Sequence, residues 1–189
     1  MKMGKNLFLI WIIAMFFITF TCTVTYLVTQ QALRLGANAI PAMLAKDTAI
    51  HLQGGLNPAA SIPANKVDAS QSDEGFVMIY DKNKNLIATS GTMKTKDPQY
   101  PKGVLEYVSK NGEDRVTWQT LNGLRFATVA IKTDNYYIVG ARSLFEIENI
   151  IEHITQLVMY IWLACLIGSA MAMLVIYAFM KKYLIKIEK

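Results

Sequence analysis

The stretch LFLIWIIAMFFITFTCTVTYLV, residues Leu7–Val28, has no charged side chain, and a second such stretch, LVMYIWLACLIGSAMAMLVIYAFM, follows at Leu157–Met180. The two runs contain 22 and 24 residues. At about 1.5 Å per residue, an α-helix of either length crosses a hydrocarbon core of about 30 Å. We therefore expect two transmembrane helices that bracket 128 residues of mixed, largely polar sequence, 29–156.

A secretory signal peptide is the alternative interpretation of the first run, because Lys2 and Lys5 precede it. The apolar region of a signal peptide normally has about 7–15 residues, and this run is longer. The Ala-x-Ala triplet at 37–39 lies well past its end, beyond Arg34. The sequence therefore favours an uncleaved membrane anchor.

The distribution of charge predicts the topology. Residues 29–156 contain 13 Lys and Arg and 13 Asp and Glu, so the whole net charge of +5 belongs to the two ends. Short basic flanks of a membrane span stay in the cytoplasm. We expect residues 1–6 and 181–189 to be cytoplasmic and the middle domain to lie outside. Because that domain is neutral overall, the high pI does not indicate nucleic-acid binding.

Catalytic and metal-binding motifs are missing from the sequence. Cys22 and Cys165 both fall inside the apolar runs, which leaves residues 29–156 without a thiol. His51 and His153 are far apart, and no nucleophile elbow, P-loop, His-Glu-x-x-His or dinucleotide-binding pattern occurs. We expect no enzyme activity, no metal and no cofactor.

One short pattern resembles the start of a calcium loop, Asp81-x-Asn83-x-Asn85. Leu86 stands where such a loop needs glycine, and its twelfth position is Thr92 rather than Glu. A solvated turn is the favoured interpretation.

The middle domain reads as α+β. Apolar spacing predicts a helix from Thr29 to about Leu52, kinked or broken at Pro41, followed by a loop over Asn57–Gly75. A short helix opens at Pro101 and stops at Asn111-Gly112, with Val104, Tyr107 and Val108 on one face. The five expected strands are Phe76–Tyr80, Leu86–Ser90, Arg115–Leu121, Leu124–Thr133 and Tyr136–Ala141.

Two details of this sheet can be predicted. Asn122-Gly123 suits a type I′ hairpin turn, in which both residues have positive φ. Phe76–Tyr80 is apolar on both faces, so the sheet should be covered on both sides, by the long helix on one and by loops over a pocket on the other.

The last strand leads into a helix. Ser143 and Glu146 have the spacing of a capping box, and no Gly or Pro follows Leu144 until Gly168. We expect one helix from here through the second apolar run to the C-terminus. Within that run Ala164, Gly168 and Ala172 have the small-residue spacing that permits close helix pairing, with a second copy or with another protein.

This order of elements, with the hairpin Tyr-Asp-x-x-x-Asn-Leu-Ile-Ala-Thr-Ser at 80–90, resembles the single-Cache, PAS-like sensor domains of bacterial membrane receptors. Residues 112–144 are also similar to small bacterial sensor-like membrane proteins. The resemblance implies a five-stranded antiparallel sheet behind a long N-terminal helix. It further implies a location in the bacterial cytoplasmic membrane and a ligand held between the sheet and the loops around the short helix.

Candidate ligand-binding residues follow from that resemblance and from side-chain chemistry, since guanidinium groups bind anions and aromatic rings form pocket walls. For Arg125 an alternative is pairing with Glu113 or Asp114, and Trp118 has an alternative as a core residue. The candidates are Tyr80, Tyr107, Arg115, Trp118, Arg125, Tyr137 and Arg142.

Three functions fit the sequence. The first is a sensor whose outer domain binds a small molecule or a protein and signals through its second span to a separate membrane partner, with a homodimer as one possibility. The second is a structural or assembly subunit whose outer domain binds other proteins. The third is a truncated receptor, because only nine residues follow Met180.

Overall fold

A computed structural model describes residues 2–94 and 96–187. Glu188 and Lys189 of the expected basic tail lie outside the described residues. Its elements are α1 (Lys2–Gly36), α2 (Ala39–Gln53), β1 (Val67–Asp68), β2 (Phe76–Tyr80), β3 (Leu86–Thr89), β4 (Gly91–Thr92), α3 (Lys102–Asn111), β5 (Glu113–Gln119), β6 (Arg125–Lys132), β7 (Tyr137–Ser143) and α4 (Phe145–Ile187). The chain divides into a helical unit, residues 1–31 with 150–189, and a sheet domain, residues 32–149.

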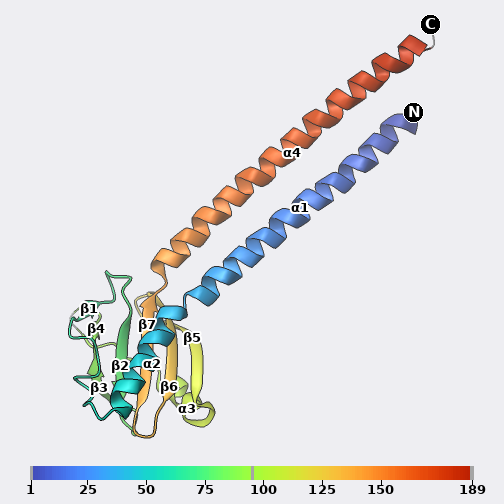
Figure 1. Ribbon diagram of the computed structural model, residues 1–189. Helices are drawn as coiled ribbons and strands as arrows, with labels where there is room; N and C mark the ends of the chain where they lie inside the picture. Colours follow the sequence, from blue (N-terminus) through green and yellow to red (C-terminus); the bar gives the residue numbers. More distant parts are fainter. Residues whose placement is uncertain (1, 95, 188–189) are drawn as a thin grey trace. The chain divides into compact units, whose positions relative to one another are not determined.

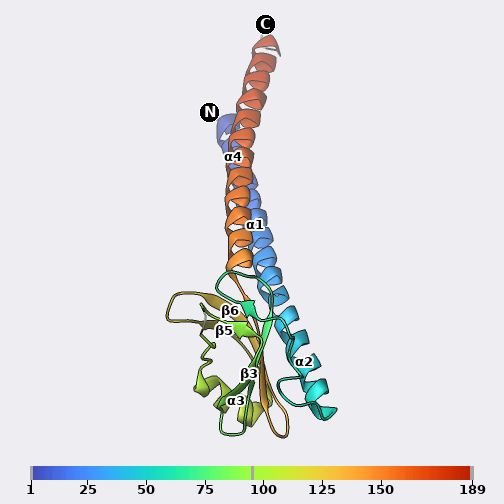
Figure 2. The same cartoon turned by 90° about the vertical axis from the view of Figure 1, so that its left-hand side faces the viewer.

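The helical unit consists of α1 and α4, which lie side by side and antiparallel (Figures 1 and 2). Trp11 Nε1 donates to Ser169 Oγ at 3.3 Å, and Trp162 Nε1 donates to Thr19 Oγ1 at 3.0 Å. Both helices are long and apolar enough to cross a membrane, since 18-residue windows within them have mean hydropathies of 2.5 and 2.2. This fits the expected two-span membrane protein.

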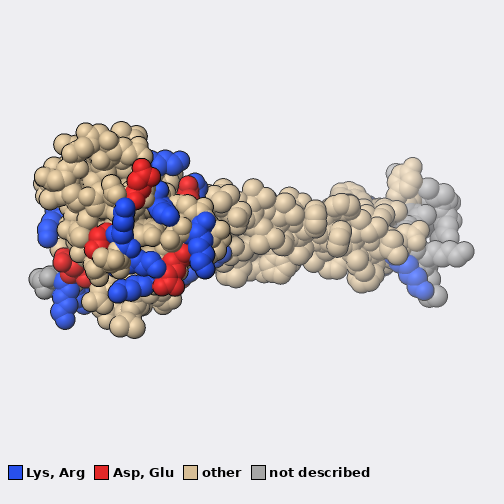
Figure 3. Space-filling view, turned by 90° about the horizontal axis from the view of Figure 1, so that it is seen from below, with Lys and Arg blue, Asp and Glu red and all other residues tan. Residues whose placement is uncertain are grey.

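Charged side chains gather on the sheet domain, as the space-filling view shows (Figure 3). The visible face of the helical unit has none over most of its length. Ala164, Gly168 and Ala172 are exposed, and a Cβ added at Gly168 would have no neighbouring atom within 4 Å. The predicted small-residue face therefore does not contact α1, and pairing with another chain stays a prediction.

The expected helix over Thr29–Leu52 is broken earlier than its proline suggests. The chain turns at Ala37 and Asn38, and the Ala42 N–H donates to the Asn38 carbonyl at 3.0 Å as α2 begins. Pro41 lies in the first turn of α2, where a missing N–H costs no helical hydrogen bond. Pro41 is thus compatible with the helix start, and the break precedes it.

The sheet domain is α+β, with five antiparallel strands in the order β3-β2-β7-β6-β5. Every residue of β2 is buried, as the two-faced apolar pattern predicts. Ala45 and Ala49 of α2 pack with Val77, Ile79 and Ile138 on one face. On the other face α3 packs with the larger part of the core (Figure 2). The five-stranded sheet with a long leading helix is confirmed in this coarse form.

Two parts of the domain differ from the sequence prediction. The segment 57–75, expected to be a loop, contains β1, which pairs in parallel with β4 through Val67 opposite Gly91. Each strand has two residues, too few to show periodicity. Tyr107, expected on the inner face of α3, is 53% exposed, and Leu105 is buried in its place.

The β5–β6 turn also differs from the expected type I′ hairpin. The Thr120 N–H donates to the Leu124 carbonyl and the Gly123 N–H to the Thr120 carbonyl, which defines a three-residue loop. Gly123 has φ +82°, whereas Asn122 is not among the described residues with positive φ. A three-residue loop needs the left-handed conformation at one position only, and glycine occupies it.

The closest approach between α2 and the sheet occurs at Gly140 of β7. A Cβ added there would lie 2.0 Å from the Pro41 carbonyl oxygen, so glycine is required for α2 to rest on this strand. Gly103 in α3 is different, because a Cβ added there would contact nothing within 4 Å.

We expect Gly140→Ala to lower the free energy of unfolding by about 1–3 kcal/mol, because α2 must shift away from β7. Gly103→Ala should be neutral or stabilising by about 0.5–1 kcal/mol, since alanine favours a helix. Denaturant unfolding of the full chain in detergent, followed by tryptophan fluorescence, measures both. Equal stabilities of the two variants would contradict this contact.

Candidate functional site

A pocket of about 610 Å³ opens in the sheet domain beside the start of α3. It lies between the β2–β3 turn and the loop that leads into α3. This volume is within the range of about 300–1,000 Å³ found for small-molecule sites. The lining residues are Tyr80, Lys84, Asn85, Leu86, Asp97, Pro98, Gln99, Tyr100, Pro101 and Lys102.

The β2–β3 turn forms one wall of this pocket and is held by Asp81. Its Oδ1 accepts the Asn85 N–H at 2.8 Å, and the Asp81 N–H donates to the Asn85 carbonyl at 2.9 Å. Lys84 adopts φ +63° at the corner of the turn. The carboxylate of Asp81, the first residue of the calcium-loop pattern, thus binds the backbone of its own turn. Within the described residues, no group of three metal-ligating side chains occurs.

Tyr80 and Tyr100 form the floor of the pocket and belong to a buried hydrogen-bond network. The Tyr100 N–H donates to the Tyr80 hydroxyl at 3.3 Å. The Tyr100 hydroxyl lies 2.9 Å from Thr128 Oγ1, which itself donates to the Val116 carbonyl at 2.8 Å. Because the single Thr128 hydrogen is thereby used, Tyr100 is the donor to Thr128.

Burial raises the pKa of Tyr80 to about 12 and that of Tyr100 to about 12. Desolvation disfavours the charged phenolate, and the hydrogen bonds only partly offset this effect. Both phenols are therefore neutral at physiological pH. They fix the loop before α3 rather than serve as acids or bases.

Charged groups line the rim of the pocket. Lys84, on the β2–β3 turn, and Lys102, at the start of α3, line it together with Asp97, so the lining has more positive than negative charge. Lys84 Nζ also lies 3.3 Å from Glu106 Oε1 on α3. With two ammonium groups, two amide side chains and aromatic edges, the pocket can bind a small polar molecule that has an anionic group.

Of the predicted ligand-binding residues, Tyr80 lines this pocket. Tyr137 is its neighbour, because Tyr80 and Tyr137 pair across β2 and β7 and both are buried. Tyr107 is exposed on α3, and Arg115 of β5 pairs with Glu113 through Nε at 2.8 Å. The structure therefore does not bring the seven candidates together.

Trp118 is a core residue. It is 6% exposed, with ring centroids 5.5 Å from Tyr100 and 5.3 Å from Phe126. Phe76 packs against Phe126 at 5.8 Å and extends this aromatic cluster. These rings fill the space between the sheet and α3, which leaves the rim of the domain as the place for a ligand.

Most lining residues of the pocket were outside the predicted set. Lys84, Asn85, Asp97 and Gln99 are ordinary polar residues in turns, and nothing in their spacing indicates a shared site. The two prolines Pro98 and Pro101 before α3 were the available signal, since they predict a rigid extended loop next to a helix start.

Arg125 and Arg142 belong to a second arrangement, at the junction between the sheet and α4. Arg125 Nη1 pairs with Glu148, so the expected pairing with Glu113 or Asp114 is wrong: in the hairpin register Arg125 lies opposite Gln119. Arg142 Nη2 lies 3.4 Å from Glu146 Oε2. Both arginines connect a strand to the first turns of α4.

Arg142 also reaches the loop before β2. Its Nε donates to the Asp73 carbonyl at 3.0 Å. One guanidinium group thus joins this loop, the end of β7 and the start of α4. A small apolar cluster of Ala37, Ala127 and Leu144, with Ile147 against it, brings the α1–α2 turn to the same junction.

The capping box expected at Ser143 forms only in part. Ser143 Oγ accepts the Phe145 N–H at 3.3 Å, and the first helical carbonyl is that of Leu144, which accepts the Glu148 N–H at 2.8 Å. Glu146 does not reach back to Ser143, because Arg142 binds its carboxylate. Ser143 still satisfies one free N–H of the helix.

Comparison with known proteins identifies no relative: no family model, no curated protein and no solved structure matches the chain. The resemblance to Cache and PAS-like sensor domains therefore stays a prediction from the sequence. The class of protein that the structure defines is an α+β domain joined to two helices able to span a membrane.

The raised tyrosine pKa values predict alkaline destabilisation. An unfolded tyrosine ionises near pH 10, whereas the folded protein keeps these protons up to about pH 12. Stability should therefore be constant to about pH 9 and fall as the pH rises from about 10 to 12. Tyr100→Phe should cost about 0.5–1.5 kcal/mol at pH 7 and flatten this fall. Unfolding at a series of pH values tests both effects, with the exposed Tyr107→Phe as the control.

Replacing Arg142 should lower the free energy of unfolding more than replacing Arg115. The Arg142 side chain is 23% exposed and holds two other segments, whereas that of Arg115 is 52% exposed and pairs with a residue on its own strand. Arg142→Gln should lower the free energy of unfolding by about 1–2 kcal/mol, and Arg115→Gln by less than about 0.5 kcal/mol. Hydrogen exchange should show faster opening near Asp73 in the first variant only.

Proposed function

We propose that this protein is a membrane-anchored sensor whose sheet domain binds a small molecule outside the cytoplasm and signals to a separate membrane partner. The single observation that supports this most is the 610 Å³ pocket, whose floor is the buried Tyr80–Tyr100 pair and whose rim has Lys84 and Lys102. These groups favour a ligand with a carboxylate or another anionic group.

The proposed topology rests on charge. The neutral domain crosses the membrane, while Lys5 and the basic residues after Met180 stay in the cytoplasm. The resemblance to bacterial receptor domains supports the bacterial cytoplasmic membrane as the proposed location. Both termini are then inside, and the Cache or PAS-like domain is outside.

A route for the signal begins at the pocket. Tyr80 pairs with Tyr137, the first residue of β7, and the last residue of that strand, Ser143, precedes α4. A seven-residue strand is about 23 Å long. At its far end the Arg142–Glu146 and Arg125–Glu148 pairs hold the first turns of α4. A ligand that prefers one arrangement of β2 and β7 would shift α4, which is unbroken to Ile187.

The test is a thermal-stability screen of the full chain in lipid nanodiscs. The panel contains amino acids, hydroxy acids and dicarboxylates, together with neutral sugars as a comparison set. An anionic compound should raise the melting temperature as its concentration exceeds its Kd. Lys102→Ala should weaken its binding about tenfold or more, because a charge-assisted hydrogen bond is lost.

Lys110→Ala is the matched control, since Lys110 is in the last turn of the same helix and does not line the pocket. It should leave binding unchanged. If no compound stabilises the chain, or if Lys102→Ala binds every compound as the unaltered chain does, the sensor proposal fails.

A structural or assembly role is the second candidate, and one observation favours it. The outer face of α2 exposes Met43 at 54% and Ile50 at 64%, and Leu121 at the β5–β6 turn is fully exposed. Apolar side chains on a domain surface mark sites of protein contact when they adjoin. The structural or assembly role would be favoured if Met43→Asp abolished binding of a partner protein and the pocket bound no small molecule.

A further inference from the structure

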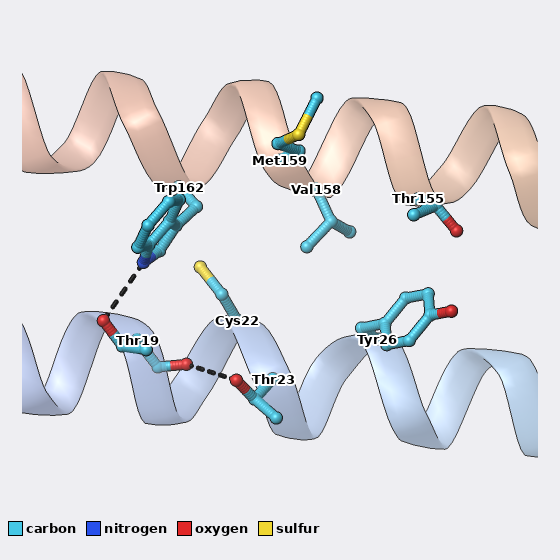
Figure 4. Close-up of a pocket in the computed structure, with 8 residues that line it drawn as sticks. All are labelled: Thr19, Cys22, Thr23, Tyr26, Thr155, Val158, Met159 and Trp162. Carbon is cyan, nitrogen blue, oxygen red and sulfur yellow. Dashed lines mark hydrogen bonds between the residues drawn. The ribbon is translucent and has the colours of Figure 1, made fainter.

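An open cavity of about 330 Å³ lies between α1 and α4 in the helical unit, and all of its lining residues are partly or fully exposed. Figure 4 shows Trp162 at one end, where its indole binds Thr19, and Tyr26 with Thr155 at the other. Cys22 and Val158 lie between these ends, with their side chains in the gap between the two helices. Thr23 and Met159 complete the lining. No residue of the sheet domain contributes to it.

The cavity exists because the side chains of Cys22 and Val158, which lie beyond the Trp162–Thr19 contact on the side of Tyr26, are small. Trp11 with Ser169 and Trp162 with Thr19 set the distance between the two helices. Cys22 and Val158 are too small to fill the same distance further along. A cavity of this size holds many atoms, since the share of one water in the liquid is about 30 Å³. Its volume corresponds to that of a small-molecule site.

The polar groups of the cavity select the chemistry of an occupant. Thr23 donates to the Thr19 carbonyl at 2.8 Å and Thr155 to the Ile151 carbonyl at 2.7 Å, so both are satisfied. The Tyr26 oxygen accepts Gln30 Nε2 at 3.3 Å, but among the described residues its own hydrogen has no acceptor. The half-exposed Tyr26 hydroxyl can therefore donate to a molecule with an acceptor oxygen.

The position of the cavity indicates the source of that molecule. Tyr26 is two residues from the end of the first apolar run, and Thr155 and Val158 are at the start of the second. In a membrane this level is the boundary between the hydrocarbon core and the headgroups, where tyrosine is enriched. Molecules dissolved in the bilayer reach it directly.

We propose that this cavity binds one apolar, carbonyl-bearing molecule from the bilayer, with the carbonyl accepting a hydrogen bond from Tyr26. Two sources share this chemistry: the ester region of a phospholipid and the ring of a membrane quinone. The site is separate from the pocket in the sheet domain and does not depend on the proposed sensor function.

Native mass spectrometry of the full chain in detergent tests the proposal. The probes are decylubiquinone and dioleoylphosphatidylglycerol, added separately. We expect one molecule bound per chain. Cys22→Phe, which fills the cavity, should lower the bound fraction at least tenfold. Cys165→Phe is the matched control, because Cys165 is exposed on α4 and does not line the cavity; it should leave binding unchanged.

The hydrogen bond has its own test. Tyr26→Phe keeps the ring and removes the donor, and should raise the Kd about 3- to 10-fold. Tyr160→Phe, on an exposed tyrosine outside the cavity, should leave the Kd unchanged. An unaltered Kd in Tyr26→Phe would overturn the assigned carbonyl contact.

Binding of the quinone, the phospholipid or both distinguishes the source. If Cys22→Phe fails to fold, as judged by circular dichroism, Val158→Phe fills the same space from α4. An absence of cavity-dependent binding with both probes, or equal losses in Cys22→Phe and Cys165→Phe, would overturn the site.

Discussion

The burial of β2 and β7 on both faces is the constraint on which the sheet domain depends. β2 has no exposed residue, and β7 is almost as completely buried. Two strands with apolar side chains on both faces need a layer on each side. On one side this layer is α2, whose backbone at Pro41 approaches so closely that β7 must have glycine at position 140. On the other side it is α3 with the aromatic cluster around Trp118.

This double covering also determines where small molecules can bind. Because aromatic rings occupy the space between the sheet and α3, the interior of the domain is closed and the cavity of interest lies at its rim. There the buried Tyr80 and Tyr100 hold a loop in place, while Lys84 pairs with Glu106 and Lys102 is exposed. This pocket and the cavity of the helical unit therefore differ in character: the first has charged residues in its lining, and the second is mostly apolar and lies between two helices of membrane-spanning length.

The junction between β7 and α4 is held by a small number of side-chain contacts. β7 leads directly into the helix, and Arg125 and Arg142 bind carboxylates in its first turns. The Arg125–Glu148 pair is about half exposed, so its own contribution to stability is small, whereas the Arg142 side chain is more covered. Their geometric effect is larger, because Arg142 also holds the loop at Asp73.

Patterns that repeat within one segment were predictable from the sequence. The length of the apolar runs predicted the two helices able to span a membrane, and β-branched and aromatic runs predicted the five strands of the main sheet. The absence of Gly and Pro between Leu144 and Gly168 predicted a continuous α4. Each of these depends on periodicity or length, which a linear sequence contains. Strands of two residues, such as β1 and β4, are too short for either signal.

Contacts between distant segments were decided by tertiary structure alone. The sequence suggested Glu113 or Asp114 for Arg125, but the strand register separates them and places Glu148 within reach. Trp118 was a candidate for a pocket wall but lies in the core, because its ring packs against those of Tyr100 and Phe126. The pocket itself joins two segments, around Lys84 and Gln99, that are 15 residues apart in the sequence. By itself the sequence determined which segments are helices and strands, because local backbone preferences and apolar patterning act over a few residues. Only the packing of those segments decided which side chains meet, because that depends on register and on close approach at positions such as Gly140.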